Sequence, residues 1–245
     1  MQNIDISEML EAGVHFGHQP SRWHPNMKPY IFTVRNGVQI IDLEKTKTAL
    51  ERALEVISKA TKDGKNILFV GTKRQAKEIV KKYASEAGVF YFVERWVGGF
   101  LTNFDVVSRS IRRLRDLKLQ RDTGELSKYT KKEQLNFSRE IEKLSALFSG
   151  VERALKTPDL LVILSAREEK TALREARRMK IPIIAVCDTN TDPTDVEYPI
   201  PANDDAIKAI EYIMKRFVGA IAEGKAQAAA PKPEEAAKPK SSTFA

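Results

Sequence analysis

Three short runs of large apolar residues constrain the fold of this chain more than any other feature. They are residues 66–71 (NILFVG), 160–165 (LLVILS) and 182–187 (PIIAVC). A strand that is apolar at nearly every position is buried on both faces, which is typical of a parallel sheet covered by helices on each side. We therefore expect an α/β fold with a parallel, flavodoxin-like or Rossmann-like sheet flanked by helices.

Helical and strand patterns alternate around these runs. Residues 89–93 predict one more strand, and residues 198–200 predict a short one. Apolar residues recur at helical spacing in the intervening segments. Helices are therefore expected over residues 44–62, 73–87, 168–179 and 204–222.

The first 43 residues predict an arm and a hairpin. Ser7 can cap a short helix that runs through Glu11, and closely spaced prolines then argue against regular structure up to residue 29. Asn36-Gly37 separates two β-rich runs within residues 30–43, which predicts a hairpin with a type I′ turn.

Residues 103–151 interrupt the alternation and carry no strand signal. Their apolar residues are spaced three and four apart in each half, which predicts an inserted antiparallel coiled-coil helical hairpin. This seam consists of Val107, Ile111 and Leu114, followed by Phe137, Ile141, Leu144 and Phe148.

The predicted organisation has three parts. Residues 1–102 and 152–224 form the α/β domain with its N-terminal arm, and residues 103–151 form the hairpin. Residues 225–245 are rich in Ala, Pro, Lys and Glu, so they bury too little apolar surface to fold and are expected to be disordered.

The formal net charge of +8 favours an anionic partner, either a nucleic acid or an anionic membrane surface. A single cysteine, Cys187, permits no internal disulfide, which fits a reducing compartment. The first residues show no secretory signal, and no apolar run approaches the length of a membrane span. We expect a cytoplasmic protein.

The predicted hairpin carries the most one-sided charge. Between residues 105 and 132, nine Lys and Arg residues stand against four acids. Arginine side chains can bind phosphate through two parallel hydrogen bonds, so this cluster favours a nucleic-acid contact. The alternative is an ordinary solvated helix face.

Two strand-to-helix junctions are further candidates. In residues 70–76 (VGTKRQA), Lys73 and Arg74 lie beside an expected helix N-terminus, which could bind phosphate. Neither phosphate-binding glycine motif is present there, which disfavours a mononucleotide site. In residues 95–103 (RWVGGFLTN), Arg95 and Trp96 could clamp a nucleotide, or the segment could be a packed corner supporting the hairpin.

Histidines and carboxylates raise the question of a metal or an active site. The spacing of His15, His18 and His24 matches no structural zinc motif. His18, Asp188 and Asp205 could converge if the arm folds onto the strand ends, either as metal ligands or as hydrogen-bonding residues that pin the arm. Asp188 and the Asp204-Asp205 pair could serve as catalytic acids, but the pair could equally cap the last helix. No catalytic motif is present, and we predict no metal, no cofactor and no enzymatic activity.

Six blocks of this sequence resemble the bacterial small-subunit ribosomal protein S-two family. The resemblance runs from about Ile6 to Gly224. The blocks are residues 15–19 (HFGHQ), 23–32 (WHPNMKPYIF), 70–76 (VGTKRQA), 95–103 (RWVGGFLTN), 188–193 (DTNTDP) and 200–207 (IPANDDAI).

This resemblance implies a structural subunit on small-subunit rRNA, between the head and the body of the subunit. It further implies neighbouring small-subunit proteins, including ribosomal protein S-one, as partners, with no membrane and no small-molecule substrate. The RNA contacts it implies are Arg22, Lys28, Lys73, Arg74, Arg95, Arg109, Arg112 and Arg113.

Two other functions stay open at this point. One is an α/β enzyme or nucleotide-binding protein that depends on Lys73 or Asp188. The other is a protein-docking module that reaches RNA only through its partners.

Overall fold

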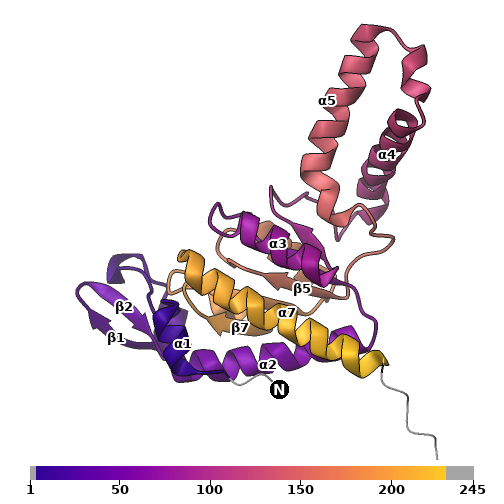
Figure 1. Cartoon of the computed structure of the whole chain (residues 1–245). Coiled ribbons are helices and arrows are strands. Elements are labelled where there is room, and N and C mark those ends of the chain that lie inside the picture. Colours follow the sequence, from indigo (N-terminus) through magenta and orange to yellow (C-terminus); the bar gives the residue numbers. More distant parts are fainter. Residues whose placement is uncertain (1–3, 230–245) are drawn as a thin grey trace, which may run out of the picture.

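A five-stranded parallel sheet forms the centre of the computed structural model, which describes residues 4–229 (Figure 1). Its strand order is β4-β3-β5-β6-β7, and every neighbouring pair is parallel. This is the flavodoxin-like order, so the predicted sheet is confirmed. The strands are β3 (Ile67–Val70), β4 (Phe90–Phe92), β5 (Leu160–Ile163), β6 (Ile183–Cys187) and β7 (Tyr198–Pro201).

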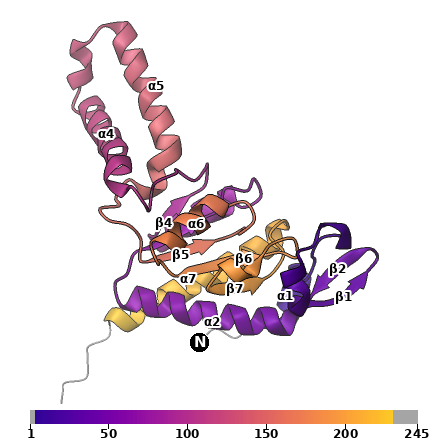
Figure 2. The same cartoon turned by 180° about the vertical axis from the view of Figure 1, so that it is seen from behind.

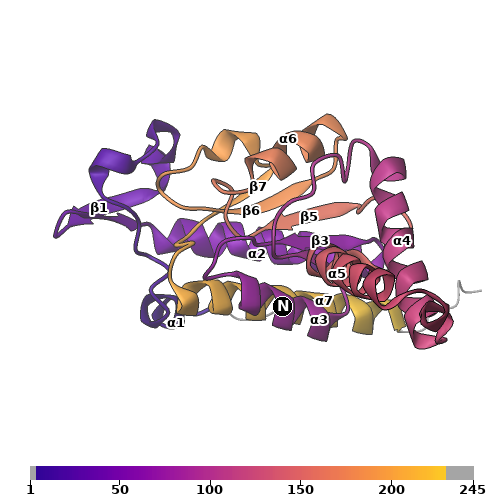
Figure 3. The ribbon, with the colours of Figure 1, turned by 90° about the horizontal axis from the view of Figure 1, so that it is seen from above.

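Helices cover both faces of this sheet. Helices α2 (Leu43–Lys62), α3 (Lys77–Ala87) and α7 (Ile207–Ala229) pack on one face. Helix α6 (Lys170–Arg178) packs on the other, as the view from above shows (Figure 3). Burial on both sides explains why β3, β5 and β6 are apolar at every position.

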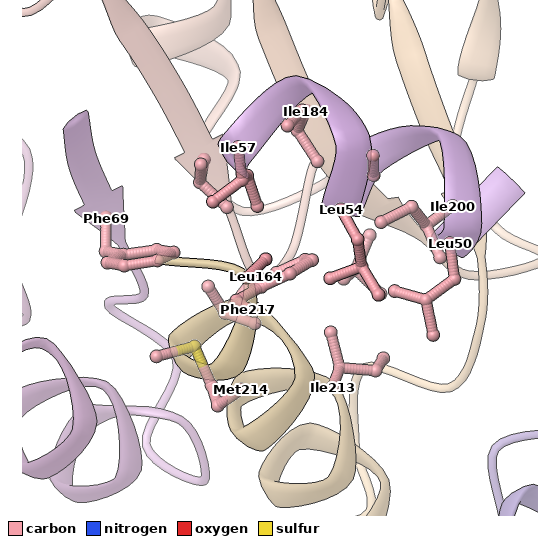
Figure 4. Packing of buried hydrophobic residues seen from close by; sticks show 14 of the residues in the cluster. Leu50, Leu54, Ile57, Phe69, Leu164, Ile184, Ile200, Ile213, Met214 and Phe217 are labelled. Carbon is pink, nitrogen blue, oxygen red and sulfur yellow. The ribbon is translucent and has the colours of Figure 1, made fainter. Parts of the chain in front are cut away.

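The larger part of the core lies between the sheet and helices α2 and α7. Figure 4 shows Leu50, Leu54 and Ile57 of α2 facing side chains of α7 and of the strands. The rings of Phe69 and Phe217 stack with their centroids 6.1 Å apart. This contact joins the middle of the sheet to α7.

Helix α3 begins later than the sequence predicts. It starts at Lys77, and residues 73–76 form a turn in which the backbone N–H of Ala76 donates to Lys73 O at 2.8 Å. The side chain of Lys73, at the start of this turn, forms ion pairs with the carboxylates of Asp204 and Asp205, which lie far along the chain. The predicted start of this helix at Lys73 is therefore wrong by four residues, although the backbone N–H of Lys77 donates to Lys73 O at 3.1 Å.

Helix α7 differs from the prediction at both ends. Asn203, and not the aspartate pair, caps the preceding turn: its Oδ1 accepts from the backbone N–H of Asp205 at 2.8 Å and of Ala206 at 3.1 Å. The helix continues through Gly224 to Ala229, so residues 225–229 are helical and not disordered as predicted. Gly224 permits close helix packing, since a Cβ atom there would lie 2.5 Å from Ser58 O of α2. The prediction for residues 230–245 lies outside the described residues.

The N-terminal arm folds against the hairpin of β1 (Ile31–Arg35) and β2 (Val38–Ile41). Asn36 and Gly37 have φ angles of 51° and 74°, which confirms the type I′ turn. Helix α1 (Ile6–Glu11) is capped by Asp5, whose side chain accepts from the N–H of Ser7, so the cap lies two residues before the predicted one. Short 3-10 helices, Pro20–Arg22 and Pro25–Tyr30, form despite the prolines.

Helices α4 (Phe104–Asp122) and α5 (Lys131–Phe148) extend away from the sheet side by side (Figures 1 and 2). A short 3-10 helix, Glu125–Lys128, lies in the connection between them. Most of the predicted seam is buried, and Phe137 and Leu144 are partly buried against the same apolar cluster. The buried seam residues are Val107, Ile111, Leu114, Ile141 and Phe148.

Candidate nucleic-acid interface

The carboxyl ends of the parallel strands carry a network of charged side chains. Lys73 follows β3, and its Nζ atom lies 2.7 Å from Oδ1 of Asp204 and 2.7 Å from Oδ1 of Asp205. Ser165, which follows β5, donates from Oγ to Oδ2 of Asp204. Open α/β sheets bind ligands at this edge, but here the chain fills it with its own ion pairs.

The N-terminal arm adds His18 to this network. His18 Nδ1 lies 3.0 Å from Oδ1 of Asp188, and its Nε2 lies 3.3 Å from Oδ2 of Asp205. The backbone N–H of His18 donates to Thr189 Oγ1 at 2.9 Å. A Cβ atom at Gly17 would lie 2.5 Å from Thr189 Cγ2, so a glycine permits this approach. The sequence correctly indicated that these side chains could converge if the arm folded onto the strand ends.

Burial and mutual charge set the protonation of the network. The hydrogen bond to Asp188 raises the pKa of His18 above its usual value. Burial raises the pKa of Asp204, and the neighbouring Asp188 adds to the rise. Burial lowers the pKa of Lys73, but the attraction of Asp204 outweighs it and the net direction is upward. His18 and Lys73 therefore favour their charged forms beside the carboxylates.

The same atoms could also hold a metal ion. His18, Asp188 and Asp205 each offer a ligand atom, and these atoms lie within 4.8 Å of one another. One imidazole nitrogen and two carboxylate oxygens are a donor set that zinc and related divalent ions accept. Lys73 already supplies positive charge to Asp205, so hydrogen bonds and ion pairs alone can pin the arm.

The segment before α4 is a packed corner built on Glu175 of α6. Trp96 Nε1 donates to Glu175 Oε1 at 2.9 Å, and the backbone N–H of Gly99 donates to the same oxygen at 2.8 Å. Trp96 also packs edge-on against Phe92 and Phe100. The packed-corner interpretation therefore holds for Trp96. Sequence reasoning missed Glu175, although an acid among the buried alanines of α6 was a usable signal.

Several cations of the α4–α5 pair are occupied within the chain. Arg113 forms two hydrogen bonds with Glu140, at 3.1 Å from Nε and 3.2 Å from an Nη atom. Arg115 donates to Glu152 O at 2.6 Å, and Lys118 pairs with Glu152 Oε2 at 2.6 Å. The one-sided charge of this segment is thus partly neutralised internally.

The eight predicted RNA contacts divide into two groups. Lys73 and Arg113 make ion pairs within the chain. The other six are exposed and make no ion pair with any residue between 4 and 229: Arg22, Lys28, Arg74, Arg95, Arg109 and Arg112.

Within residues 4–229, none of the helices combines the length and the apolar character that a bilayer crossing needs. Cys187 is fully buried, and burial raises the pKa of its thiol.

These features define a doubly wound α/β protein with an inserted helical pair, whose ligand edge is closed by its own arm. Residues 9–224 match the sequence model of the family described as Ribosomal protein S2, and the chain belongs to this family. The predicted resemblance is confirmed.

Relatives include two proteins named small ribosomal subunit protein uS2. That of Coprothermobacter proteolyticus is 47% identical over 225 residues, which cover 92% of this chain and 84% of the relative. That of a Picosynechococcus species is 44% identical over 225 residues, covering 92% and 88%. The family consists of structural proteins of the small ribosomal subunit and not of enzymes, which confirms that expectation.

Proposed function

We propose that this chain is a structural component of the small ribosomal subunit that binds small-subunit rRNA and helps dock ribosomal protein S-one. In this role it supports translation in the cytoplasm, beside neighbouring small-subunit proteins. One observation carries the proposal: six of the eight cations expected to contact RNA are exposed and make no ion pair within residues 4–229. They are free to neutralise phosphates.

The positions of these cations suit an RNA backbone. Arg22 and Lys28 lie on the arm, Arg74 and Arg95 follow β3 and β4, and Arg109 lies on α4. A set of cations spread over several elements positions a protein on a phosphate backbone without reading bases. The closed strand edge argues against the nucleotide-binding alternative, since Lys73 is held by Asp204 and Asp205.

The domain division is part of the same proposal. Residues 103–151 form an inserted coiled-coil hairpin on an α/β domain made of residues 1–102 and 152–224. Burial of Ile111 and Leu114 in α4 and of Ile141 and Phe148 in α5 supports a heptad seam. Such a projecting unit could reach an rRNA segment or a protein that the sheet does not.

Sedimentation through a sucrose gradient tests the function directly. The tagged chain should comigrate with small subunits at low salt and should bind protein-free small-subunit rRNA with an affinity that falls as salt rises. Subunits that lack the chain should retain less ribosomal protein S-one. A chain that stays at the top of the gradient and binds no rRNA would contradict the proposal.

A paired variant tests the exposed cations. Arg109→Gln with Arg112→Gln should lower the log–log salt slope of rRNA binding by up to about 2, because each lost phosphate contact lowers it by about 0.9. The control is Lys81→Gln with Lys208→Gln, two exposed cations of α3 and α7. Crosslinking decides the protein-docking alternative, which predicts no direct RNA adduct on Arg95 or on α4.

A further inference from the structure

Helix α6 presents a row of cations that the predicted RNA contacts do not include. Lys170, Arg174 and Arg177 recur at positions i, i+4 and i+7, and all three are exposed. Ala172, Leu173 and Ala176 form the opposite, buried side of the helix. The polar side of α6 is therefore almost entirely cationic.

The arm turns this helix face into one wall of a groove of about 430 Å³. Arg22 and His24 of the arm and residues 190–192 after β6 contribute the other walls. Five cations and two carboxylates line the groove: Arg22, Arg167, Lys170, Arg174 and Arg177, with Asp192 and Asp195.

Both carboxylates are already engaged by the chain. Asp192 Oδ1 accepts from Asn26 Nδ2 at 3.0 Å and from Thr194 Oγ1 at 2.7 Å, and Asp195 pairs with Arg177. In contrast, Arg22, Arg167 and Lys170 make no ion pair with any residue from 4 to 229. The groove therefore keeps an unneutralised positive charge.

We propose that this groove binds the sugar–phosphate backbone of RNA. The inference rests on the proposed rRNA binding. It adds the groove beside α6 to the RNA contacts that the family resemblance implies. Four of the five lining cations are arginines, whose planar side chains can hold phosphate through two hydrogen bonds. Seven residues of helix span about 10 Å, which matches about three phosphates of one strand.

The lining favours RNA over a membrane or a protein segment. Its apolar members, Ala166 and Leu173, are buried, so the groove exposes no apolar side chain that could enter a bilayer or pack on a partner. His24 is the one ring among its lining side chains, and no Phe, Tyr or Trp lines the groove for bases to stack on. Charge and hydrogen-bond donors remain, and these recognise a phosphate backbone.

The test compares two triple variants of the full chain. Arg167→Gln, Lys170→Gln and Arg174→Gln remove three cations of the groove. Lys62→Gln, Lys81→Gln and Lys208→Gln remove the same charge from exposed positions of α2, α3 and α7, on the other face of the sheet. Binding to protein-free small-subunit rRNA is measured between about 50 and 300 mM salt. The urea midpoint of each variant is also measured and should equal that of the unmodified chain.

The groove variant should lower the log–log salt slope by about 2 to 3 and weaken binding on the order of 100-fold at 0.1 M salt, with a much smaller effect in the control variant. Equal losses of rRNA affinity in both variants would overturn the proposal that the groove binds RNA. That outcome would not contradict the proposed rRNA binding by the chain as a whole. A groove variant that binds rRNA normally but loses affinity for phosphatidylserine vesicles would also overturn the proposal that the groove binds RNA. An unmodified chain that binds no rRNA would overturn the proposed function as well.

A second measurement uses the unmodified chain. Lys170 should be protected from acetic anhydride in the rRNA complex, whereas Lys81 should react as fast as in the free protein. Equal reactivity of Lys170 with and without rRNA would contradict the inference, even if the groove variant were to fold poorly.

Discussion

The Nζ atom of Lys73 lies 2.7 Å from a carboxylate oxygen of Asp204 and 2.7 Å from one of Asp205. A side chain expected to contact RNA is thus held inside the chain, where it compensates the buried carboxylate of Asp204. This contact joins the turn after β3 to the turn before α7.

Replacing Lys73 should therefore affect stability. Lys73→Met leaves the Asp204 carboxylate buried without its cation and should lower the free energy of unfolding by about 3 kcal/mol, since breaking a buried pair is costly. Urea denaturation measures the loss. Adding Asp204→Asn to Lys73→Met should recover part of it. A Lys73→Met variant with normal stability but weakened rRNA binding would restore Lys73 as an RNA contact.

Arg113 should behave as a partner of Glu140. Both side chains are substantially exposed, so their coupling in a double-mutant cycle of Arg113→Gln and Glu140→Gln should be about 0.5 kcal/mol. Glu140→Gln alone should leave rRNA affinity unchanged or slightly increase it, because it frees a guanidinium. Zero coupling in urea denaturation would contradict this expected stabilisation.

Gly17 should control the docking of the arm. A Cβ atom at this position would lie 2.5 Å from Thr189 Cγ2 and 3.2 Å from Gln39 O, so Gly17→Ala should cost about 1–3 kcal/mol by overpacking. Hydrogen exchange should speed up at Gly17 and His18, whose N–H groups donate to Gln39 O and Thr189 Oγ1. Thr189→Ser removes Cγ2 and should rescue part of the loss. Unchanged exchange in Gly17→Ala would contradict this account.

Glu175 should make stability depend on acid pH. Burial raises the pKa of its carboxyl, but hydrogen bonds from Trp96, Gly99, Leu101 and Thr102 outweigh burial and lower the pKa below its usual value. A carboxyl with a lowered folded pKa stabilises the protein above its unfolded pKa and loses that contribution as pH falls through the folded value.

The matched variant is Glu175→Gln. At pH 7 it should lose about 1–2 kcal/mol of stability, because donors to a charged acceptor lose part of their interaction. Between pH 5 and pH 3 the unmodified chain should lose stability more steeply than the variant. Parallel urea midpoints across this range would indicate that the corner does not depend on the charge of Glu175.

The sheet could be predicted because burial on both faces leaves a direct record in the sequence. Each apolar run, such as residues 160–165, contains a strand in the structure, and the Asn36-Gly37 turn follows from local backbone preferences. These features depend on neighbouring residues alone. The convergence of His18 with Asp188 could be predicted only on the condition that the arm folds onto the strand ends, where the carboxyl ends of parallel strands share one edge.

The errors arose where distant residues decide the outcome. The start of α3 is accompanied by an ion pair between Lys73 and Asp204, which are 131 positions apart. The last helix was expected to end at residue 222, but Gly224 permits close packing against Ser58 of α2 and the helix continues to Ala229. In the same way, no local pattern shows that Glu140 neutralises Arg113 while Arg109 makes no ion pair with residues 4–229. The groove beside α6 needs the arm to fold back and could not be read from α6 alone.

The contact between His18 and Thr189 also means that the arm can dock only after residue 189 has been synthesised. The two residues are 171 positions apart, so at typical elongation rates the arm waits about 10 to 30 s for its binding surface to emerge. During this interval the strand ends that the arm packs against in the folded chain are not yet complete. Ribosome-bound chains stalled before residue 188 should therefore show an arm open to protease.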